Sequence, residues 1–534
     1  MLLVISAQIW AGLKTYGGTN WDQLWGNDFY GSNIVANLFS MSYKVDASTG
    51  ADFVVIVSTA SGSPVWERIV GKSNMNEWSY KITYDNSGNP IIGGVSCVPY
   101  NNLPSRCSYS TSTRAFAIKL NGSNGNFISA RDMASNWGAT KDWIRILGIN
   151  STSDGGFVVA GDIPYSSCDQ WGNCTYDDDG FLAKFNSSMT LQWAQIVGTG
   201  GNEFLTSAFQ TTDGNIVAVG TSFNEIWVAK FNVNNGSIIW QRRYPRSYYD
   251  DGTGKYFTWA KPASDGGIII ADEISGGTNR DVLFVKLDGN GNFVCARRIG
   301  GSGHDVGIDV AEGVNYYYVA GMWNGSDLFY ARFDKSNCNL VGSVRYILSS
   351  GDEQARAIDI RPGSGIPYIA GYTNRAGWTA GNYDGLLAAD SGTQDTCFWR
   401  SLTPSTNVSV SLSNSGSWTT YGNYITVSSA SYSVVAVNTN KTVACGLLTP
   451  LSNFESYEDC YLSYSIRNGF LNLNSKSKQD IYIKIYSIDG KLTYKREFRN
   501  FEGVIKEPVK LGSGVYIVKF KYINGEKKQK VIIR

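Results

Sequence analysis

The stretch Trp193–Trp240, WAQIVGTGGNEFLTSAFQTTDGNIVAVGTSFNEIWVAKFNVNNGSIIW, contains the pattern that decides the fold. It consists of a glycine turn with an acidic residue, a polar run, an Asp-Gly turn, a hydrophobic strand, an aromatic strand and a closing tryptophan. Related copies begin at Trp10 (WAGLKTYGGTNWD), Trp66 (WERIVGKSNMNEW) and Cys295 (CARRIGGSGHD). The hydrophobic and the aromatic strand each recur seven times before Trp399.

A spacing of roughly 45 to 65 residues, with several short alternating strands per copy, is typical of four-stranded propeller blades. One small twisted sheet cannot bury both faces, whereas sheets in a ring pack face to face and leave only short edges. The sequence therefore predicts an all-β chain. We expect a seven-bladed β-propeller over residues 1–400, a β-rich segment over 401–460 and a small C-terminal β-sandwich over 461–534.

Within each copy, the hydrophobic strand is interpreted as the inner strand of its blade, as in DGNIVAVG from Asp213. Asp-Gly and Asn-Gly pairs are expected to supply the positive φ angles of two-residue hairpins. Tryptophans lie where a strand ends and the chain crosses to the next blade, so we expect them to pack between blades. These are Trp66, Trp193, Trp240 and Trp399.

The composition agrees with a large β-protein, because the chain of 534 residues has 59 glycines, 13% aromatic residues and only 17% charged residues. No apolar stretch is long enough for a transmembrane helix. The first residues allow two interpretations. Residues 1–7 could be a signal-peptide remnant, with Gln8 beginning the mature chain. Alternatively, Leu2 to Trp10 could imitate an outer strand and close the ring beside the last blade.

Nine cysteines indicate disulfides if the protein is exported. Three pairings are expected from their positions in the repeats: Cys97 with Cys107, Cys168 with Cys174, and Cys295 with Cys338. Cys397, Cys445 and Cys460 then leave one thiol over, and the sequence does not say which.

Residues 401–440 contain no charged residue and alternate small polar with apolar side chains at period two, which predicts strands. These strands could form a hairpin layer on the propeller. They could also present an uncharged edge that recruits a second copy of the chain, with Val410 and Tyr424 as self-association candidates.

The last part of the chain contains the patterns IYxxDGK, LxxGVYIVKF and GEKKQKVIIR, with hairpin turns expected at Asp489-Gly490 and Asn524-Gly525. This segment resembles the C-terminal sorting domain of the type IX secretion system. The resemblance implies export to the cell surface and contact with the secretion machinery. The propeller resembles the secreted propellers that accompany such tails. The sorting-like motif consists of Tyr486, Asp489, Gly490, Lys491, Leu511, Gly514, Val515, Tyr516 and the basic residues Lys527 to Lys530.

Residues 467–534 hold 16 Lys plus Arg against 6 Asp plus Glu, a net charge of 16 − 6 = +10, while the whole chain has +1. The rest must therefore sum to about −9. We interpret the basic tail as serving sorting or anchoring to anionic lipopolysaccharide. No nucleic-acid partner is expected, because basic and aromatic residues are not interleaved.

One acidic residue recurs after the glycine turn of each copy, and we expect it to cap backbone N–H groups rather than to catalyse. No catalytic residue is assigned, and His304, the single histidine, does not support a histidine-dependent mechanism or a metal site. No cofactor is expected. Ca²⁺ at Asp177 to Gly180 or at Asp288 to Asn292 is an alternative to simple hairpin turns. The recurring acids are Asp22, Glu77, Asp142, Glu203, Asp250 or Asp251, Asp305 and Glu353.

Three functions are compatible with these observations, because propellers serve many functions. The preferred hypothesis is a secreted, non-enzymatic structural or adhesive protein that forms an extracellular matrix or filament through β-edges. The second is a glycan- or surface-ligand-binding propeller that uses Tyr- and Trp-rich loops such as NYYYV at Asn315 and SCDQWGNC at Ser167. The third is an extracellular hydrolase or lyase.

Overall fold

The computed structural model describes the backbone in a series of ranges, and the regular elements in them are all strands. The ranges are 12–17, 22–31, 33–40, 51–59, 64–100, 103–107, 113–135, 144–168, 174–198, 201–222, 225–246, 258–346, 351–374, 383–389, 399–402, 406–410, 419–421, 425–429, 433–436, 440–445, 456–458, 462–467, 470–487, 491–508, 514–522 and 525–533.

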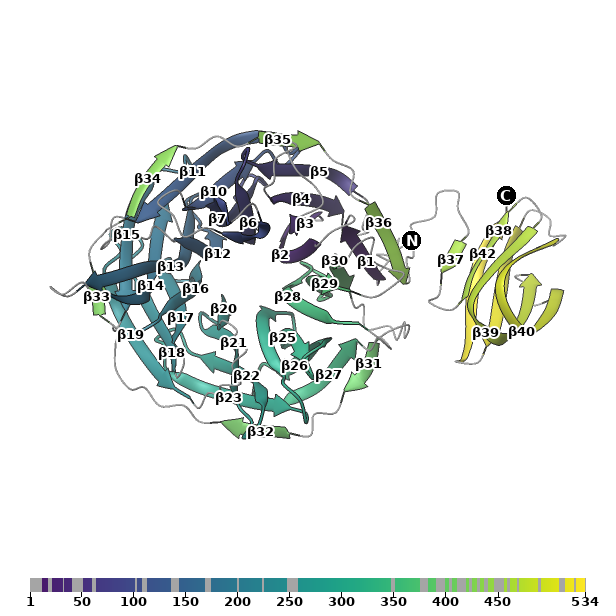
Figure 1. The fold of residues 1–534 in the computed structure, drawn as a ribbon. Helices are drawn as coiled ribbons and strands as arrows, with labels where there is room; N and C mark the ends of the chain where they lie inside the picture. The colour runs from purple at the N-terminus through teal and green to yellow at the C-terminus, as the bar shows by residue number, and fades with distance from the viewer. Residues whose placement is uncertain are drawn as a thin grey trace, which may run out of the picture. The chain divides into compact units, whose positions relative to one another are not determined.

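Seven antiparallel sheets form a closed ring around a central axis, which confirms the predicted seven-bladed β-propeller (Figure 1). Blades 1 to 3 consist of β2 (Asp22–Tyr30), β3 (Asn33–Ser40), β4 (Asp52–Thr59) and β5 (Pro64–Gly71); β6 (Asn76–Tyr84), β7 (Pro90–Cys97), β10 (Arg114–Leu120) and β11 (Phe127–Ser135); and β12 (Arg145–Ser151), β13 (Phe157–Cys168), β14 (Cys174–Phe185) and β15 (Leu191–Gly198). A small hairpin, β8 (Pro99–Tyr100) with β9 (Leu103–Cys107), extends from blade 2.

Blades 4 to 7 repeat this order from the axis outward. They consist of β16 (Phe204–Gln210), β17 (Ile216–Ser222), β18 (Glu225–Phe231) and β19 (Ile238–Pro245); β20 (Trp259–Pro262), β21 (Ile268–Ser275), β22 (Arg280–Leu287) and β23 (Phe293–Gly300); β24 (Val306–Glu312), β25 (Tyr316–Trp323), β26 (Asp327–Asp334) and β27 (Leu340–Tyr346); and β28 (Glu353–Ile360), β29 (Pro367–Thr373), β30 (Asp384–Ala389) and β1 (Gly12–Gly17).

The N-terminal strand β1 closes the ring, because it is the fourth strand of blade 7 and pairs beside β30. The strand that closes the ring is Gly12–Gly17, directly after the segment for which the sequence suggested this role, and ring closure by Leu2 to Trp10 itself stays a prediction. Leu2 to Trp10 lie outside the described residues. Trp399 does not end blade 7, because it begins a strand that pairs with blade 6 at Tyr346.

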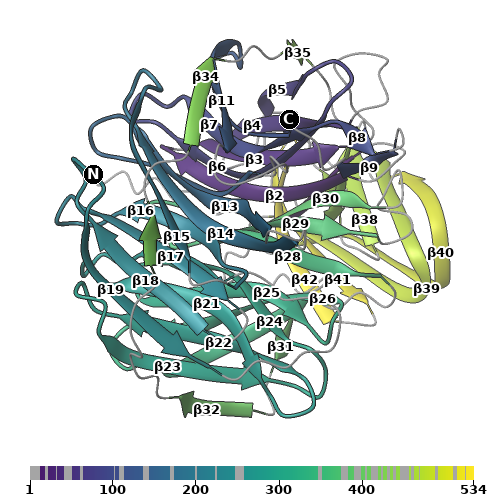
Figure 2. The same cartoon turned by 60° about the vertical axis from the view of Figure 1, so that its left-hand side comes forward.

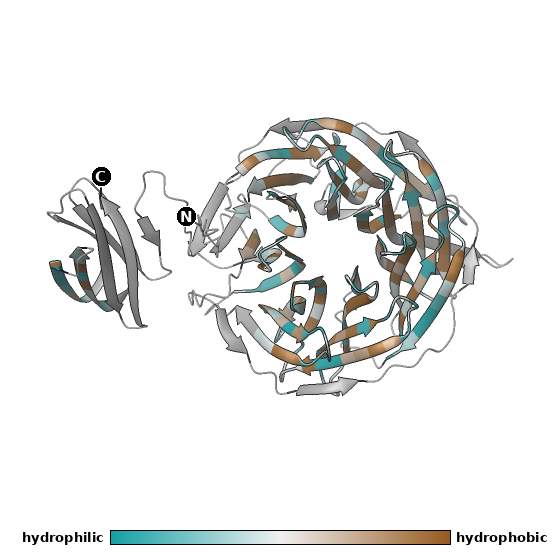
Figure 3. Cartoon of the chain, turned by 180° about the vertical axis from the view of Figure 1, so that it is seen from behind, coloured by the Kyte–Doolittle hydropathy of each residue, from teal (hydrophilic) through white to brown (hydrophobic). Residues whose placement is uncertain are grey.

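The strand interpreted as inner from the sequence is the second strand of each blade. In blade 4, for example, residues 216–222 form β17, and the strand at the axis is β16, made by the polar run after the acidic residue. The second and third strands carry the most apolar residues because both of their faces are covered by neighbouring blades (Figure 3). The polar runs are left to line the axis.

The hydrophobic core lies between successive blades. One core cluster combines Leu182 and Trp193 of blade 3 with Leu205, Trp227 and Phe231 of blade 4. Corresponding clusters join blades 1 and 2, 2 and 3, 4 and 5, and 5 and 6. This is the packing that the repeat predicts, because a blade buries its faces only against its neighbours.

In blades 1 and 3, a tryptophan near the start of the fourth strand, and not at its crossing to the next blade as the sequence predicted, links the blade to a turn of the next. The indole Nε1 of Trp193 donates to Val233 O at 2.8 Å, and Trp66 donates to Gly122 O at 2.8 Å. A glycine with positive φ lies against the ring in each case, Gly236 (φ 70°) and Gly125 (φ 72°). For these two residues the predicted packing between blades is confirmed.

The Asp-Gly turns differ from the two-residue hairpins that the sequence predicts. In blade 4, Gly214 N donates to Thr211 O at 2.9 Å and Thr211 N donates to Asn215 O at 2.9 Å, which makes a three-residue loop. Only Gly214 has a positive φ, 83°. This geometry is a type I turn followed by a glycine bulge, which requires a single left-handed residue.

A buried lysine on the third strand braces most of these turns. Lys184 Nζ lies 2.7 Å from Asp154, and Lys230 and Lys286 make the same contact with Asp213 and Asp265 at 2.9 and 2.8 Å. Lys184 also donates to Phe185 O, at 3.0 Å. The ammonium groups are buried, so these bonds offset the cost of removing them from water.

Six strands from residues 399–445, named here the belt, run around the outside of the ring against the order of the blades (Figure 1). Each pairs singly with the outer strand of a different blade, and none of them pairs with another belt strand, so the segment is not a hairpin layer. Among the described residues, only blade 4 has no belt strand. The belt consists of β31 (Trp399–Leu402), β32 (Thr406–Val410), β33 (Thr419–Tyr421), β34 (Ile425–Ser429), β35 (Ser433–Ala436) and β36 (Asn440–Cys445).

The C-terminal residues form a separate six-stranded sheet built around two long curved strands, β39 and β40 (Figure 2). One edge of β39 pairs with β38 near Leu471 and with β41 near Ile485. Ile483 and Ile485 are buried, whereas Lys484 between them is exposed. The strands are β37 (Ser456–Glu458), β38 (Leu462–Arg467), β39 (Phe470–Ser487), β40 (Leu492–Pro508), β41 (Gly514–Tyr522) and β42 (Gly525–Ile533).

Candidate functional site at the propeller axis

The innermost strands share one irregularity that shapes the axis. In six blades the pairing with the second strand skips one residue, so that each innermost strand carries a β-bulge at the equivalent place. A bulge redirects the side chain of the extra residue and is frequent next to functional sites. The extra residues are Trp25, Tyr80, Leu147, Thr206, Ile308 and Arg356.

On one side of the axis the bulge residues make an aromatic and cationic group. The Arg356 guanidinium lies over the ring of Trp25 at 4.5 Å and over that of Tyr372 at 5.3 Å. Trp25 in turn meets Tyr80 edge to face, with ring centroids 5.5 Å apart. Trp25, Tyr80 and Arg356 are all half-buried, so this group is accessible in part.

Two lysines from different blades converge on one carboxylate beside this group. Lys81 Nζ lies 3.4 Å and Lys261 Nζ 3.6 Å from Asp309 Oδ2. Asp309 also accepts the backbone N–H of Ile358 at 3.0 Å. The Lys81 ammonium lies 4.3 Å from the centroid of Trp259, which adds a cation–π contact.

Burial and charge move the pKa values of these groups in different directions. Burial would raise the pKa of Asp309, but Lys261 and Lys81 outweigh it and lower that pKa. Burial lowers the pKa of Lys81, and Asp309 opposes this only in part. Burial would also lower the pKa of Lys261, but nearby carboxylates raise it.

Two further carboxyl groups at the axis behave differently from Asp309. Burial raises the pKa of Asp359 to about 7, against the opposing effect of Lys261. Burial likewise raises the pKa of Asp28, although its oxygens accept the N–H groups of Phe29 at 2.7 Å and Tyr84 at 3.0 Å. The axial group therefore combines three basic side chains, Lys81, Lys261 and Arg356, with one carboxyl group whose pKa is lowered and two whose pKa is raised, and this composition favours an anionic ligand.

An apolar cluster occupies the other side of the axis. Leu147, Trp259 and Ile308 are buried and pack together, with Tyr80 and Phe204 against them. The axis thus has an apolar part, made mainly by blades 3, 5 and 6, and an adjoining charged, aromatic part with residues from blades 1, 2, 5, 6 and 7. We name the charged part, Trp25, Asp28, Tyr80, Lys81, Lys261, Asp309, Arg356 and Asp359, the axial site.

Two of the recurring acidic residues, Asp305 and Glu77, cap backbone N–H groups as predicted. Asp305 accepts the N–H groups of Gly301 at 2.5 Å and Asn324 at 2.7 Å. Glu77 accepts the N–H of Lys72 at 3.2 Å. The backbone N–H groups of five of these residues also bond to a carbonyl of the preceding blade. These five are Asp22, Glu77, Glu203, Asp305 and Glu353, whereas Asp142, Asp250 and Asp251 lie outside the described residues.

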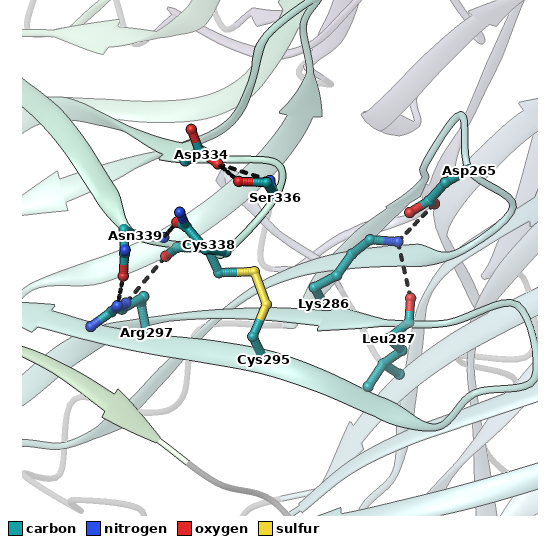
Figure 4. The surroundings of a disulfide bond; sticks show 10 residues. Asp265, Lys286, Leu287, Cys295, Arg297, Asp334, Ser336, Cys338 and Asn339 are labelled. Carbon is teal, nitrogen blue, oxygen red and sulfur yellow. Dashed lines mark hydrogen bonds and ion pairs between the residues drawn. A yellow bond between two sulfur atoms is a disulfide. The ribbon is translucent and has the colours of Figure 1, made fainter.

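Of the predicted disulfides, Cys295–Cys338 is present and joins blade 5 to blade 6 (Figure 4). Cys295 lies in the repeat position where Trp193 and Trp240 lie in other blades, and Cys338, with φ 59°, takes the place of the turn glycine. Cys97 is also disulfide-bonded. The pairing of Cys97 with Cys107 stays a prediction. Cys168 and Cys174 are directly opposed in the β13–β14 register, and their bond also stays a prediction.

Of the two self-association candidates, Val410 lies at the rim of the ring, on a belt strand. Val410 ends β32 and pairs with Ala296 of blade 5. Tyr424 lies outside the described residues. The NYYYV segment is not a loop, because Tyr317 and Tyr318 are buried in β25. That part of the glycan-binding hypothesis is therefore wrong, and residues 169–173 of the second aromatic segment lie outside the described residues.

The residues considered for calcium make turns and ladder contacts. Asp288 Oδ1 accepts the N–H groups of Asn290 at 2.9 Å and Asn292 at 2.8 Å. Asp178 offers its carbonyl to the N–H of Glu203. His304 likewise offers its carbonyl to the N–H of Gly325 at 2.7 Å. In the part of the chain that the structure describes, no three His, Cys, Asp or Glu side chains gather as a metal site would require.

The sorting-like motif lies in the strands of the C-terminal sheet. Tyr486 pairs with Leu492 and Ile517, and Tyr516 pairs with Ser487 and Val531. Ser487 and Lys491 close the hairpin that was expected at Asp489-Gly490, with a bond of 2.9 Å. At the second expected turn, Tyr522 is opposite Gly525, so the turn lies one residue earlier than predicted. Gly514 and Val515 begin β41, and Lys527 to Lys530 lie in β42, whereas Asp489, Gly490 and Leu511 lie outside the described residues.

Residues 467–534 match the secretion system C-terminal sorting domain. The chain is therefore a secreted, cell-surface protein in which a seven-bladed β-propeller precedes a type IX sorting domain, and it engages the secretion machinery. A comparison with curated proteins yields no match. Within the described ranges, no helix has the length and hydrophobicity needed to cross a bilayer.

Solved structures similar to this chain have low sequence identity. The Dos1 propeller is 10% identical, with 71% of this chain and 95% of that chain covered and a TM-score of 0.38. The polysaccharide lyase Uly1 is 7% identical, with 71% and 97% covered and a TM-score of 0.39. A Trypanosoma rangeli sialidase in complex with 2,3-difluorosialic acid is 10% identical, with 96% and 84% covered and a TM-score of 0.33. Similarity at this level carries no inference about ligand or activity.

The residues of the axial site were not singled out from the sequence. A signal was present in the repeats, because the third residue after the recurring acid is Trp25, Tyr80, Thr206, Ile308 or Arg356 in successive aligned copies. Such variation at a fixed repeat position differs from the regularity of the Trp and Gly positions. It would have singled out this repeat position for attention, although Thr206 and Ile308 at this position are buried.

Proposed function

We propose that this secreted protein is an adhesive, ligand-binding protein of the cell surface and that the axial site holds an anionic ligand with an apolar face. The observation that carries the proposal is the convergence of Lys81, Lys261 and Arg356 with the ring of Trp25. Charged groups on several rigid strands, together with aromatic surface, are the usual composition of a ligand site. Cations in a partly buried site make strong hydrogen bonds to anions.

The test is binding of anionic and neutral oligosaccharides to the full chain by isothermal titration calorimetry. Arg356→Ala removes a cation that stacks on Trp25, and Arg242→Ala is the matched control, because Arg242 stacks on Trp240 at 5.6 Å on an outer strand. We expect Arg356→Ala to weaken anion binding by about 10- to 100-fold, as loss of a charged hydrogen-bonding group does. Arg242→Ala should change it less than about twofold by the same reasoning. Equal effects of the two variants, or no anion binding by the native protein, would refute the proposal.

Self-association through the belt is the second candidate function. It is favoured by two observations: the belt strands are terminal in their sheets, and residues 401–440 have no charge. A terminal strand leaves backbone groups that can pair with a second chain. In sedimentation velocity over a range of concentrations, oligomers of the native protein should disappear in Val410→Lys. They should persist in Val294→Lys, a control at an exposed position of β23, in the same blade. A native protein that is monomeric at every concentration excludes this candidate.

A further inference from the structure

Arg356 is the cation of the axial site whose side chain has no hydrogen-bonding partner in the described part of the chain. Lys81 and Lys261 both contact Asp309. A further arginine near the site, Arg145 of β12, acts electrostatically on Tyr80 but is already paired. Its Nε donates to both carboxylate oxygens of Asp162, at 3.0 and 3.1 Å. The Nε atom of Arg356 is buried and without a partner among the described residues, and its two terminal nitrogens are accessible and make no hydrogen bond to those residues.

Aromatic rings flank the guanidinium of Arg356. Two rings contact this group from neighbouring blades, that of Trp25 on blade 1 and that of Tyr372 on blade 7. The backbone carbonyl of Arg356 also accepts Lys81 Nζ at 3.4 Å, which ties the bulge to blade 2. A planar group held in this way is prepared for a planar, two-oxygen partner, because little side-chain freedom is lost on binding.

The carboxyl groups of the site restrict the kind of anion. Asp28, Asp309 and Asp359 lie on the three neighbouring strands β2, β24 and β28. Of their oxygens, those of Asp309, whose pKa is lowered, disfavour a doubly charged phosphate, since like charges in a partly buried site repel strongly. The same oxygens accept hydrogen bonds from hydroxyl groups. A ligand that matches the site therefore has one singly charged, planar acid group and several hydroxyl groups.

We propose that the axial site binds a carboxylated pyranose, such as a hexuronic acid residue of a polysaccharide, and that the terminal nitrogens of Arg356 hold its carboxylate in a two-bond fork. This inference rests on the proposed function and specifies its ligand. The half-buried ring of Trp25 supplies the apolar surface for the C–H face of the sugar. The aspartates accept the sugar hydroxyls.

The experiment compares three probes by calorimetry on the full chain: tetragalacturonate, its methyl ester, and a sulfated galactan tetrasaccharide. We expect tetragalacturonate to bind at least about tenfold more tightly than either other probe, because only it offers the planar carboxylate. Arg356→Lys keeps the charge and removes the fork, so it should weaken tetragalacturonate binding by about tenfold or more and leave the weaker sulfated probe nearly unchanged. Arg242→Lys is the matched control and should change neither.

The outcomes separate this inference from the proposed function. Tighter binding of the sulfated probe, or an Arg356→Lys variant that binds tetragalacturonate as well as the native protein, overturns the carboxylate inference and leaves an anion site. Absence of binding by every anionic probe overturns both. If Arg356→Lys does not fold, as judged by its thermal transition, the ranking of the three probes on the native protein still decides the question.

Discussion

Trp193 provides the sharpest test of how the blades are held together. Its ring is 7% exposed, stacks on Phe231 with centroids 6.4 Å apart, and donates from Nε1 to Val233 O at 2.8 Å. Replacing Trp by Ala removes this packing on both blades at once. Substitutions of this kind cost about 3 to 5 kcal/mol of unfolding free energy, and we expect Trp193→Ala to fall in that range.

A second variant divides this effect into packing and hydrogen bonding. Trp193→Phe keeps an aromatic ring but leaves Val233 O without its donor, which should cost about 1 kcal/mol for the hydrogen bond, in addition to the loss of ring volume. Val294→Ala on β23 is the control, because that side chain is 54% exposed and should change stability by less than about 0.5 kcal/mol.

Urea unfolding of the full chain, followed by far-UV circular dichroism, measures the three variants without relying on tryptophan fluorescence. Stability should decrease from the Val294 variant through Trp193→Phe to Trp193→Ala. A loss below about 1 kcal/mol for Trp193→Ala would show that the contact between blades 3 and 4 does not depend on this ring.

Three other predictions concern the disulfide, the axial site and the tail. Replacing both Cys295 and Cys338 by serine opens a loop with a sequence separation of 43 and should lower the unfolding free energy by up to about 4 kcal/mol; an unchanged urea midpoint would contradict this. Because Asp359 has a pKa of about 7 and is neutral below it, an anionic ligand should bind more tightly at pH 6 than at pH 8. The charges of three other groups also act on Asp359, namely Lys261, Asp28 and Asp309. The variant Asp359→Asn is therefore needed to assign the effect, and calorimetry should show that its affinity for the ligand differs less between pH 6 and pH 8. Deleting residues 467–534 should leave a folded propeller that accumulates inside the cell, and cell fractionation that finds it outside at normal yield would contradict the sorting assignment.

The repeat was sufficient to predict the ring, because each copy encodes its own strands and turns. Trp193 lies near the start of a fourth strand, and Asp305 caps the N–H of Gly301 in the turn just before it. Both places depend on the local pattern. Neighbouring blades then pack in the order of the sequence. The residues that cover one face of a blade can therefore be predicted from the next copy of the pattern. The sorting motif was recognised for the same reason, since its residues lie within one short segment.

The axial site and the belt depended on the closed ring. Trp25 and Arg356 are 356 − 25 = 331 positions apart, and they meet only because β1 joins blade 7 and brings its innermost strand beside that of blade 1. The period-two pattern of residues 401–440 predicts strands but contains no information about which edges they pair with. Backbone hydrogen bonds are the same at every edge, so the partners of the belt strands follow from the circumference of the ring and the length of chain between strands. The local sequence thus determined the blades, and the closed tertiary structure decided which residues face one another across the axis.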